Sequence, residues 1–581
     1  MKSIGIMFVA ALFVAGLLHL WVRLRELQVE DAASYGLASA RQSVRRVQTS
    51  GLRGRILDRT GRVLAGNRLS YSIVCEPAVF QKRTWEGTVA EIRNAIDAVS
   101  ALIGRPSPLG ESAIRRHVSR SLAMPLVVWR DIDADALAVF EEHAWQHPGF
   151  GVAESAERTY PYGALAAHLI GYVGRDRGET EAGDERISFF MPELRGRAGL
   201  ELYYDSYLRG VCGEKRVVVD ARGFAIREQV VAEPQQGPDL RLALDARLQN
   251  AAERELRGVC GACVAIDPRD GDVLAMASAP AYDLNSFLPT LRSEVYGRLT
   301  GDPEKPLVNR AAGAAYEPGS TFKPVTALAA LSCGHPADGV YSCAGVFELG
   351  DMRLHCASRW GHGELDLRHA LMRSCNPFFC ELGMKAGTNA LLRAARAFGL
   401  GSRTGIDLFR VEKEGLVGDA EWKARKYGAS WYGGDLALMA IGQGLLLVTP
   451  LQMAVLAGAI GTGRRVTPHL RLGVAPEFAE LPFAAEHLRV VREGMRMVVA
   501  GDGGQRGSGR LGGEGLDVAV SGKTGTAEVG EGAQRRKNTW FIAWAPSDQP
   551  RIAVSLVVEN GESGGTTAAP RVRNVLKEFF R

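Results

Sequence analysis

One segment near the amino terminus, residues 4–22, limits where the rest of the chain can fold. It is a run of 19 residues without a full charge, followed by Arg23 and Arg25. At about 1.5 Å per residue it forms a helix of roughly 28 Å, close to the thickness of a bilayer core. A cleaved signal peptide is the alternative, but the run is longer than a typical signal-peptide core and no clean small-residue cleavage site follows it. We therefore expect residues 1–25 to be a short cytoplasmic tail and a transmembrane signal anchor, with the folded part of the chain outside the cytoplasm.

The length of the remaining chain predicts more than one domain. With 581 residues in total, two or three domains are expected after the anchor. A hydrophobic share of 46% and a charged share of 23% are typical of a globular protein. The formal net charge of +5 is small, the basic residues are scattered, and there is no zinc-finger, helix-turn-helix or basic-stripe pattern. We therefore expect no nucleic-acid partner.

A connector rich in proline and glycine, EPQQGPD at residues 233–239, divides the part after the anchor. Before the connector, short strand patterns alternate with two helical patterns, residues 87–103 and 133–145. Asp133 is available as the N-cap of the second helix. Because this stretch contains no catalytic constellation, we expect residues 26–238 to form an elongated, non-catalytic pedestal of mixed α/β structure.

The chain after the connector, residues 239–581, has the pattern of one α+β domain. Strand-like runs occur near both of its ends, and a long helix-rich section lies between them. A sheet that is completed by distant segments and covered by helices accounts for this order. The expected strands are residues 264–267, 273–276, 518–529, 540–545 and 552–558, the helix-rich section is 318–460, and a terminal helix is expected at 568–580.

The first candidate catalytic motif is Ser320-Thr-Phe-Lys323, preceded by Glu317-Pro-Gly. Proline and glycine suit the start of a helix, so Ser320 is expected in the first turn, near unpaired backbone N–H groups. Lys323 lies on the same helical face, within reach of Ser320. A serine hydroxyl needs a base to take its proton, and a lysine can serve only when burial or a neighbouring cation lowers its pKa. Alone this motif is a weak signal, because a surface serine near a lysine is common.

The second motif is Ser374-Cys-Asn376. The Ser374 hydroxyl would relay a proton between Lys323 and a leaving amine, and the Asn376 amide would bind the substrate backbone.

The third motif, Lys523-Thr-Gly-Thr526, lies in a strand-like run. Lys523 would supply the cation that keeps Lys323 deprotonated, and Gly525 would let an extended substrate approach the strand edge. The hydroxyls of Thr524 and Thr526 would bind a substrate carboxylate. The backbone N–H groups of Ser320 and Thr526 would form an oxyanion hole.

Each triplet is common, but all three in this order, at separations of 54 and 149 residues, are not. The ordered set is the signature of penicillin-binding proteins and class A β-lactamases. Longer stretches extend the likeness, and by them the chain resembles the class B penicillin-binding proteins, most of all the elongation type, penicillin-binding protein 2. The stretches are RGRILDRTGRVLA (53–65), RTYPYGALAAHLIGYVG (158–174) and GRAGLELYYDSYLRG (196–210) for the pedestal, and LALDARLQ (242–249), AYEPGSTFKPVTALAAL (315–331), SCNPFFCELGMKAG (374–387) and AIGQGLLLVTPLQ (440–452) for the transpeptidase domain. Asn376 departs from the pattern, since elongation-type relatives often carry Asp there.

The resemblance implies a serine-type D-Ala-D-Ala transpeptidase that binds penicillin. Ser320 would be the acylated nucleophile, Lys323 the base and Ser374 the third catalytic residue. The substrate would be bound by Asn376, Lys523, Thr524, Gly525 and Thr526. Peptidoglycan stem peptides would be cross-linked, β-lactams would trap Ser320, and no cofactor would be needed for the acyl transfer.

The resemblance also implies a place and a partner. The protein would be single-pass in the inner membrane, with its catalytic domain in the periplasm, and would act in cell elongation and shape maintenance. The pedestal lacks the motifs of a glycan polymerase, and such a domain would need about 150–200 further residues. A lipid II polymerase of the elongation machinery in the same membrane is therefore the expected partner.

Other functions stay open from the sequence. A division-type penicillin-binding protein or a D,D-carboxypeptidase would use the same motifs. A β-lactamase would need groups that activate a deacylating water, and no long pedestal. A non-enzymatic penicillin sensor or scaffold is disfavoured by the intact set of Ser320, Lys323 and Lys523.

Four potential metal ligands, Cys343, Cys356, His362 and Cys375, have the spacing C-x12-C-x5-H-x12-C. Three thiolates and one imidazole complete a tetrahedron without an open position, which suits one structural Zn²⁺. Cys375 lies inside the second motif, so a metal would hold that motif from behind. Some elongation-type relatives carry zinc at the corresponding place. A Cys343–Cys356 disulfide, metal-free buried cysteines, or a different fourth ligand (His355, Asp351 or Cys380) are the alternatives.

Overall fold

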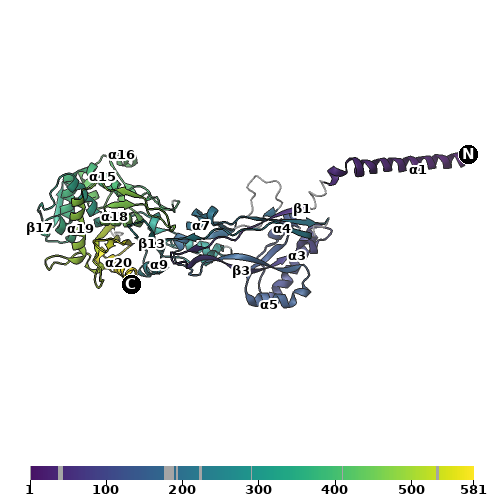
Figure 1. Cartoon of the computed structure of the whole chain (residues 1–581), viewed down its shortest axis with the longest axis horizontal. Helices are drawn as coiled ribbons and strands as arrows, with labels where there is room; N and C mark the ends of the chain where they lie inside the picture. The colour runs from purple at the N-terminus through teal and green to yellow at the C-terminus, as the bar shows by residue number, and fades with distance from the viewer. Residues whose placement is uncertain are drawn as a thin grey trace.

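The computed structural model describes residues 2–36, 44–122, 124–175, 189–190, 194–220, 225–289, 291–408, 410–530 and 536–581. Figure 1 shows an elongated molecule. The helix α1 (Lys2–Arg25) stands at one end, a strand-rich pedestal follows, and a helix-rich domain with the carboxyl terminus lies at the far end.

The helix α1 is long and apolar enough to cross a bilayer, with a mean hydropathy of 2.3 in its most apolar part. Large apolar side chains along it, such as Phe8 and Trp21, are exposed rather than packed against the protein. An isolated apolar helix of this kind is unfavourable in water and favourable in lipid. These properties agree with the anchor expected at residues 4–22.

Two larger sheets and a two-stranded pair, β6 (Val173–Arg175) with β8 (Leu194–Gly196), build the pedestal. In the first, β1 (Val44–Thr49) lies between β9 (Gly213–Val219) and β7 (Phe189–Phe190), and β10 (Ala225–Ala232) forms the edge beyond β9. In the second, the long β3 (Val63–Cys75) pairs with three strands. They are β2 (Ile56–Leu57), β4 (Leu126–Ile132) and β5 (Phe150–Thr159).

Helices pack against the second sheet, where buried side chains such as Ile96 and Phe140 meet the apolar face of β3 and β4. The predicted helices are α3 (Trp85–Ile103) and α5 (Ala134–His143). Asp133 caps α5, because its carboxylate accepts a hydrogen bond of 2.9 Å from the backbone N–H of Ala136. A third helix, α4 (Glu111–Ser121), is not predicted by the sequence.

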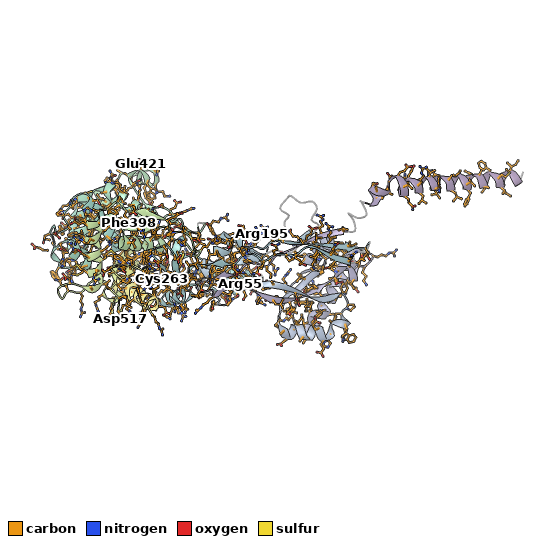
Figure 2. The ribbon with its side chains drawn as sticks, viewed as in Figure 1. Arg55, Arg195, Cys263, Phe398, Glu421 and Asp517 are labelled. Carbon is orange, nitrogen blue, oxygen red and sulfur yellow. The ribbon has the colours of Figure 1, made fainter. Side chains whose placement is uncertain are left out.

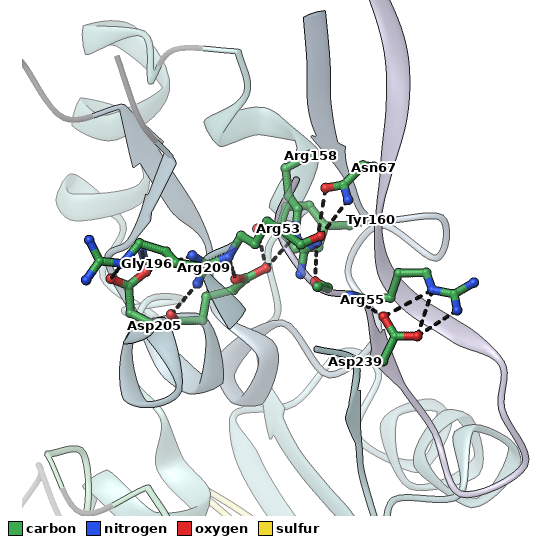
Figure 3. Close-up of polar contacts among 11 residues, drawn as sticks. Arg53, Arg55, Asn67, Arg158, Tyr160, Gly196, Asp205, Arg209 and Asp239 are labelled. Carbon is green, nitrogen blue, oxygen red and sulfur yellow. Dashed lines mark hydrogen bonds and ion pairs between the residues drawn. The ribbon is translucent and has the colours of Figure 1, made fainter. Parts of the chain in front are cut away.

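The pedestal meets the second domain in a narrow neck, where Figure 2 places Arg55. A cluster of charged side chains lies buried here, and we call Arg53, Arg158, Glu201 and Asp205 the neck cluster (Figure 3). The fully buried Glu201 carboxylate accepts hydrogen bonds from Arg53 Nε at 2.6 Å and from Arg158 Nε at 2.7 Å. Arg53 also donates to Asp205 at 2.7 Å.

The chain crosses the neck at the end of the connector. Arg55 pairs there with Asp239 at 2.6 Å, and both side chains are partly exposed. The next strand, β11 (Leu240–Arg241), pairs in parallel with β2 of the pedestal. The first residues after the expected boundary at residue 238 are therefore still tied to the pedestal sheet.

The second domain is built on a five-stranded antiparallel sheet with the order β13-β12-β24-β23-β22. Its strands come from both ends of the domain, which confirms the expected α+β arrangement with a sheet completed by distant segments. They are β12 (Gly261–Ile266), β13 (Val273–Ala279), β22 (Ser521–Val529), β23 (Arg536–Ala545) and β24 (Ile552–Val558).

Helices cover both faces of this sheet, because successive side chains of a strand point to opposite sides. One face packs against α9 (Ala246–Glu255) and α20 (Ala569–Phe579), the predicted terminal helix. The other face packs against the apolar α18 (Pro450–Thr462). This helical side continues into the section that carries the first two motifs.

Candidate active site

Ser320 lies in a short 3-10 turn, Gly319–Phe322, that leads directly into α12 (Lys323–Ser332). Gly319 has a left-handed φ of 55°, a conformation that glycine adopts without steric cost. The strand β22 passes very close, since a Cβ on Gly525 would lie 2.8 Å from the carbonyl oxygen of Pro318. Glycine at this position is thus needed for packing the third motif against the serine turn, a role that the sequence analysis did not assign to it.

Lys323 is fully buried beneath this turn. Its amine donates hydrogen bonds of 2.7 Å to the Ser374 carbonyl oxygen and to Asn376 Oδ1, and one of 3.4 Å to Ser374 Oγ. Burial lowers the pKa of Lys323 to about 8. All of these acceptors are neutral, so a deprotonated Lys323 is within reach near neutral pH.

Ser374 ends α13 (Leu367–Arg373) in the left-handed conformation, with a φ of 57°. This backbone geometry is uncommon for a residue with a side chain. It places the Ser374 hydroxyl between the two lysines of the site. Ser374 Oγ accepts a hydrogen bond of 2.8 Å from Lys523 Nζ and one of 3.4 Å from Lys323 Nζ.

Lys523 is also fully buried. Burial, and then the charge of Lys323, hold the pKa of Lys523 well below its usual value. The sequence predicts Lys523 as the cause of the lowered pKa of Lys323. The structure instead assigns the lowered pKa of Lys323 first to burial. Both amines bond to one hydroxyl, that of Ser374.

Asn376 starts α14 (Asn376–Ala386) and already has partners on both ends of its amide. Its Oδ1 accepts from Lys323, and its Nδ2 donates to the His355 carbonyl oxygen at 2.9 Å. The amide therefore ties the base to the hairpin of β15 (Val346–Leu349) and β16 (Met352–His355). Its predicted contact with substrate stays a prediction.

The hydroxyls of the third motif lie along β22. Thr524 Oγ1 donates to Ser508 Oγ at 3.1 Å, and Thr526 Oγ1 accepts from the backbone N–H of Gly564 at 3.3 Å. Ser508 is exposed beside Thr524. Ser508 is not predicted from the sequence, because it lies in a glycine-rich loop without any motif.

Glu317 is a second residue that the sequence analysis left without a role. Its carboxylate accepts a hydrogen bond of 2.9 Å from the backbone N–H of Gly444, and its carbonyl oxygen accepts one of 3.0 Å from the Trp540 indole. Burial raises the pKa of this carboxyl. Glu317 therefore joins the serine turn to a neighbouring loop and to β23. Its position immediately before Pro318 was the only sequence signal.

The four predicted metal ligands come together directly behind the second motif. The sulfur atoms of Cys343, Cys356 and Cys375 and a ring nitrogen of His362 all lie within 4.8 Å of one another. Cys356 Sγ is 3.2 Å from His362 Nδ1 and 4.0 Å from Cys375 Sγ. Sulfur atoms on a tetrahedral zinc, with bonds of about 2.3 Å, lie about 3.8 Å apart. This Cys3His group could therefore hold a metal ion.

The hydrogen bond between the thiols of Cys356 and Cys375 lowers the pKa of Cys356 and raises the pKa of Cys375. A metal binds deprotonated thiols, and Cys356 is the thiol of this pair that loses its proton more readily. Cys343 and Cys356 are free thiols in this structure rather than a disulfide. Cys380, an alternative ligand in the sequence analysis, instead points its thiol to the Ala437 carbonyl oxygen at 3.7 Å.

Two family models cover most of the chain. The penicillin-binding protein transpeptidase domain matches residues 261–577, and the penicillin-binding protein dimerisation domain matches residues 48–242. The chain therefore belongs to the penicillin-binding proteins of the class that joins these two domains.

Named relatives and solved structures agree with this assignment. The chain is 31% identical to the peptidoglycan D,D-transpeptidase MrdA of Escherichia coli (strain K12), over 99% of this chain and 92% of that protein. It is 31% identical to MrdA of Acinetobacter baumannii, over 97% and 85%. The fold is similar to the Helicobacter pylori penicillin-binding protein PBP2 in its complex with MreC, with a TM-score of 0.79, 27% identity, and 92% and 99% of the two chains covered. It is also similar to a chain of a peptidoglycan synthase complex that coordinates polymerization and crosslinking, with a TM-score of 0.73, 30% identity, and 99% and 98% covered.

Proposed function

We propose that this chain is an elongation-type peptidoglycan D,D-transpeptidase that forms its acyl-enzyme on Ser320. The observation that carries the proposal is the pair of buried lysines, Lys323 and Lys523, which share the hydroxyl of Ser374. Burial without a carboxylate partner lets a lysine lose its proton near neutral pH, as a general base requires. Burying two amines without a charged partner costs stability, so a purely structural role does not explain them.

The proposed first half-reaction gives each of these residues a role. Neutral Lys323 takes the proton of Ser320 Oγ as this oxygen attacks the carbonyl carbon of the penultimate D-Ala of a stem peptide. The backbone N–H groups of Ser320 and Thr526 stabilise the negative oxygen of the tetrahedral intermediate. The C–N bond then breaks, and the leaving D-Ala amine receives a proton through the Ser374 hydroxyl.

The second half-reaction reverses these roles. An amine of a neighbouring stem peptide attacks the Ser320 ester and loses a proton through the same relay. The ester bond breaks, Ser320 regains its proton, and a new peptide cross-link remains. Lys523 and the hydroxyls of Thr524 and Thr526 would hold the substrate carboxylate, and Asn376 and Gly525 would complete the substrate-binding strand edge.

Acyl transfer to Ser320 is tested by mapping the adduct of benzylpenicillin. Mass spectrometry after proteolysis should find the penicilloyl group on the peptide that contains Ser320, and Ser320→Ala should abolish labelling without unfolding the domain. An adduct on any other serine would refute the assignment.

The Cys3His group is the proposed site of one structural Zn²⁺. A metal bound by Cys343, Cys356, His362 and Cys375 would fix the backbone on both sides of Cys375, and so position Ser374 and Asn376. Elemental analysis should give about one zinc per chain, and Cys375→Ser should lower both metal content and acylation. Cys333→Ser, a change at an exposed cysteine, is the control. Metal-free protein with full acylation would contradict the proposal.

Location and partner follow from the family likeness. We place the chain in the inner membrane with residues 26–238 as the pedestal and residues 239–581 as the periplasmic transpeptidase domain. The likeness to PBP2 bound to MreC and to a chain of a synthase complex supports partners in the elongation machinery. A lipid II polymerase in the same membrane would supply the glycan, so the purified chain alone should polymerise none.

A further inference from the structure

Ser508, a serine in the loop between α19 (Ala485–Ala500) and β22, lies next to the third motif without being part of it. Thr524 Oγ1 donates a hydrogen bond of 3.1 Å to Ser508 Oγ. Thr524 is buried, with 7% of its surface exposed, whereas Ser508 is exposed. The Thr524 hydroxyl is thus turned toward a second hydroxyl that reaches solvent.

The loop holds Ser508 in a fixed position. Its neighbours Gly507 and Gly509 are both buried, and a Cβ on Gly507 would lie 2.1 Å from the Val498 carbonyl oxygen. The backbone N–H of Gly509 donates to that same carbonyl oxygen at 2.9 Å, and the backbone N–H of Ser508 donates to the Met372 carbonyl oxygen at 3.3 Å. Between two closely packed glycines, Ser508 is therefore the side chain that this turn presents, and little conformational entropy is lost when it binds a ligand.

Ser508 lies between the second and the third motif. Met372, which accepts its backbone hydrogen bond, comes two residues before Ser374 in the chain. Thr524, which bonds to its side chain, follows directly after Lys523. Lys523 Nζ in turn donates to Ser374 Oγ at 2.8 Å. One loop residue is therefore tied to both of the motifs that surround the buried amine Lys523.

The hydrogen atoms of three hydroxyls decide which of them can bind an anion. A hydroxyl has one hydrogen to donate, and that of Thr524 is donated to Ser508. Thr526 Oγ1 accepts from the backbone N–H of Gly564 at 3.3 Å, which leaves its own hydrogen free. Among the described residues, no acceptor takes the hydrogen of Ser508 or that of Thr526. The two hydroxyls that can donate to an anion here are therefore those of Ser508 and Thr526.

The spacing of these two donors suits a carboxylate. Thr524 and Thr526 are two residues apart on the edge strand β22, so their side chains leave the same face of the strand about 7 Å apart. Ser508 Oγ extends from the first of these side chains toward solvent. A carboxylate accepts hydrogen bonds on both of its oxygens, and a charged acceptor gains about twice as much from a hydroxyl as a neutral one does.

We propose that Ser508, together with Thr526, binds the terminal carboxylate of the stem peptide, and that Thr524 is a positioning residue that acts through Ser508. The Ser508 hydroxyl donates to one carboxylate oxygen, and the Thr526 hydroxyl donates to the other. Because Ser508 Oγ accepts from Thr524, its own hydrogen is directed toward the substrate. This inference rests on the proposed function and refines it, since Thr524 here holds the carboxylate through Ser508.

The test compares two acylating agents that differ only at the carboxylate, benzylpenicillin and its methyl ester. Acylation rates of the full-length protein in detergent are followed by mass spectrometry. We expect Ser508→Ala to lower the rate with benzylpenicillin about 10–100-fold, the scale of one hydrogen bond to a charged group, and the rate with the ester less than about two-fold. Ser508→Thr keeps the hydroxyl and should retain most of the rate. Ser402→Ala, at an exposed serine whose hydroxyl donates to the Gly399 carbonyl oxygen, is the matched control and should change neither rate.

A double-mutant cycle tests how the two hydroxyls depend on each other. Thr524→Val removes the hydrogen that Ser508 accepts, so it should also slow acylation by benzylpenicillin more than acylation by the ester. If Thr524 acts through Ser508, the double variant should react within about two-fold of the rate of Ser508→Ala. Losses that multiply in the double variant would show that the hydroxyls contact the carboxylate independently, and would overturn the roles proposed here.

Two further outcomes would overturn the inference. One is a wild-type rate of Ser508→Ala with benzylpenicillin, and the other is an equal loss with the acid and the ester, which would indicate a structural role. Acylation of the wild type at Ser320 separates this inference from the proposed function. Without that acylation the transpeptidase mechanism fails, whereas an acylated wild type whose Ser508→Ala variant keeps its preference for the acid refutes only the role of Ser508.

Discussion

The neck cluster and the catalytic centre both bury basic side chains, but these side chains have different hydrogen-bond partners in the two regions. In the neck cluster, Arg53 and Arg158 bond to the carboxylate of Glu201. In the catalytic centre, the described residues that accept hydrogen bonds from Lys323 and Lys523 do so with hydroxyl, amide and carbonyl groups only. Buried cations therefore stay paired in one region and have neutral partners in the other.

The difference teaches what each region does. A carboxylate stabilises a buried cation, and the cost of desolvation is then offset by attraction. The pKa of Arg53 is accordingly raised, although burial opposes this. Neutral acceptors cannot offset the cost fully, and the pKa values of both lysines fall. The neck cluster suits a fixed joint, whereas the lysine pair suits proton transfer.

The largest expected effect comes from removing the base. Lys323→Met should lower the rate of acylation by benzylpenicillin by about 10²–10⁴-fold, the usual contribution of a general base. The free energy of unfolding should change by less than about 1 kcal/mol, because loss of a buried amine offsets the two acceptors left unpaired. Stopped-flow acylation and chemical denaturation measure the two quantities. The control Lys577→Met, at an exposed lysine of α20, should change neither the acylation rate nor the free energy of unfolding. A strongly destabilised Lys323→Met would contradict the contrast between the lysine pair and the neck cluster.

The opposite pattern is expected in the neck cluster. Glu201→Gln removes the carboxylate that compensates Arg53 and Arg158, so it should destabilise the pedestal by about 3–5 kcal/mol. Acylation of the folded protein should stay near the wild-type rate. Calorimetry should show an earlier pedestal transition, and Glu141→Gln on the exposed side of α5 should stay within about 0.5 kcal/mol of the wild type. If the pedestal of Glu201→Gln unfolds at the same temperature as that of the wild type, the Glu201 carboxylate does not stabilise the two buried arginines.

A smaller effect is expected at the edge of the same neck. Arg55 and Asp239 form a close ion pair, but the Arg55 side chain is half exposed. Solvent screens such a pair, and surface ion pairs contribute little to stability. Arg55→Ala should therefore unfold with the same midpoint as Glu141→Gln, and added salt should remove any remaining difference. A loss of stability as large as that of Glu201→Gln would show that solvent exposure does not determine how much an ion pair of the neck contributes to stability.

Local patterns predicted much of the fold. The helix α5 follows its N-cap Asp133, and the strands β23 and β24 contain the apolar runs that predicted them, so these elements needed no tertiary information. The strand predicted at 518–529 begins only at Ser521, and its residues are mostly polar or glycine. The helix α4 was missed because its sequence, ESAIRRHVSRS, shows only Ile114 and Val118 as buried apolar positions among charged and polar residues. Its stability comes from packing against the pedestal core, which the sequence alone does not display.

The candidate site, too, could be predicted from the sequence only in part. Spacing and residue type predicted the four ligands of the Cys3His group, which do come together. The sequence predicted that the Ser374 hydroxyl lies within reach of Lys323. It did not predict the bond of Lys323 to Asn376, or that burial rather than Lys523 is the first cause of its lowered pKa. Burial depends on how α12, α13 and β22 close around the amine. Ser508 was missed for the same reason, since only tertiary contact brings it to Thr524.

The pH dependence of acylation tests most directly whether burial makes Lys323 the base. A protonated amine cannot accept the Ser320 proton, so lowering the pH below the pKa of about 8 must slow the reaction. Rates of acylation by benzylpenicillin should be measured from about pH 5 to about pH 9, with a stability check at each pH. The account predicts a rate that falls about ten-fold per pH unit well below the pKa and levels off above it. A rate that stays constant over this whole range would contradict it.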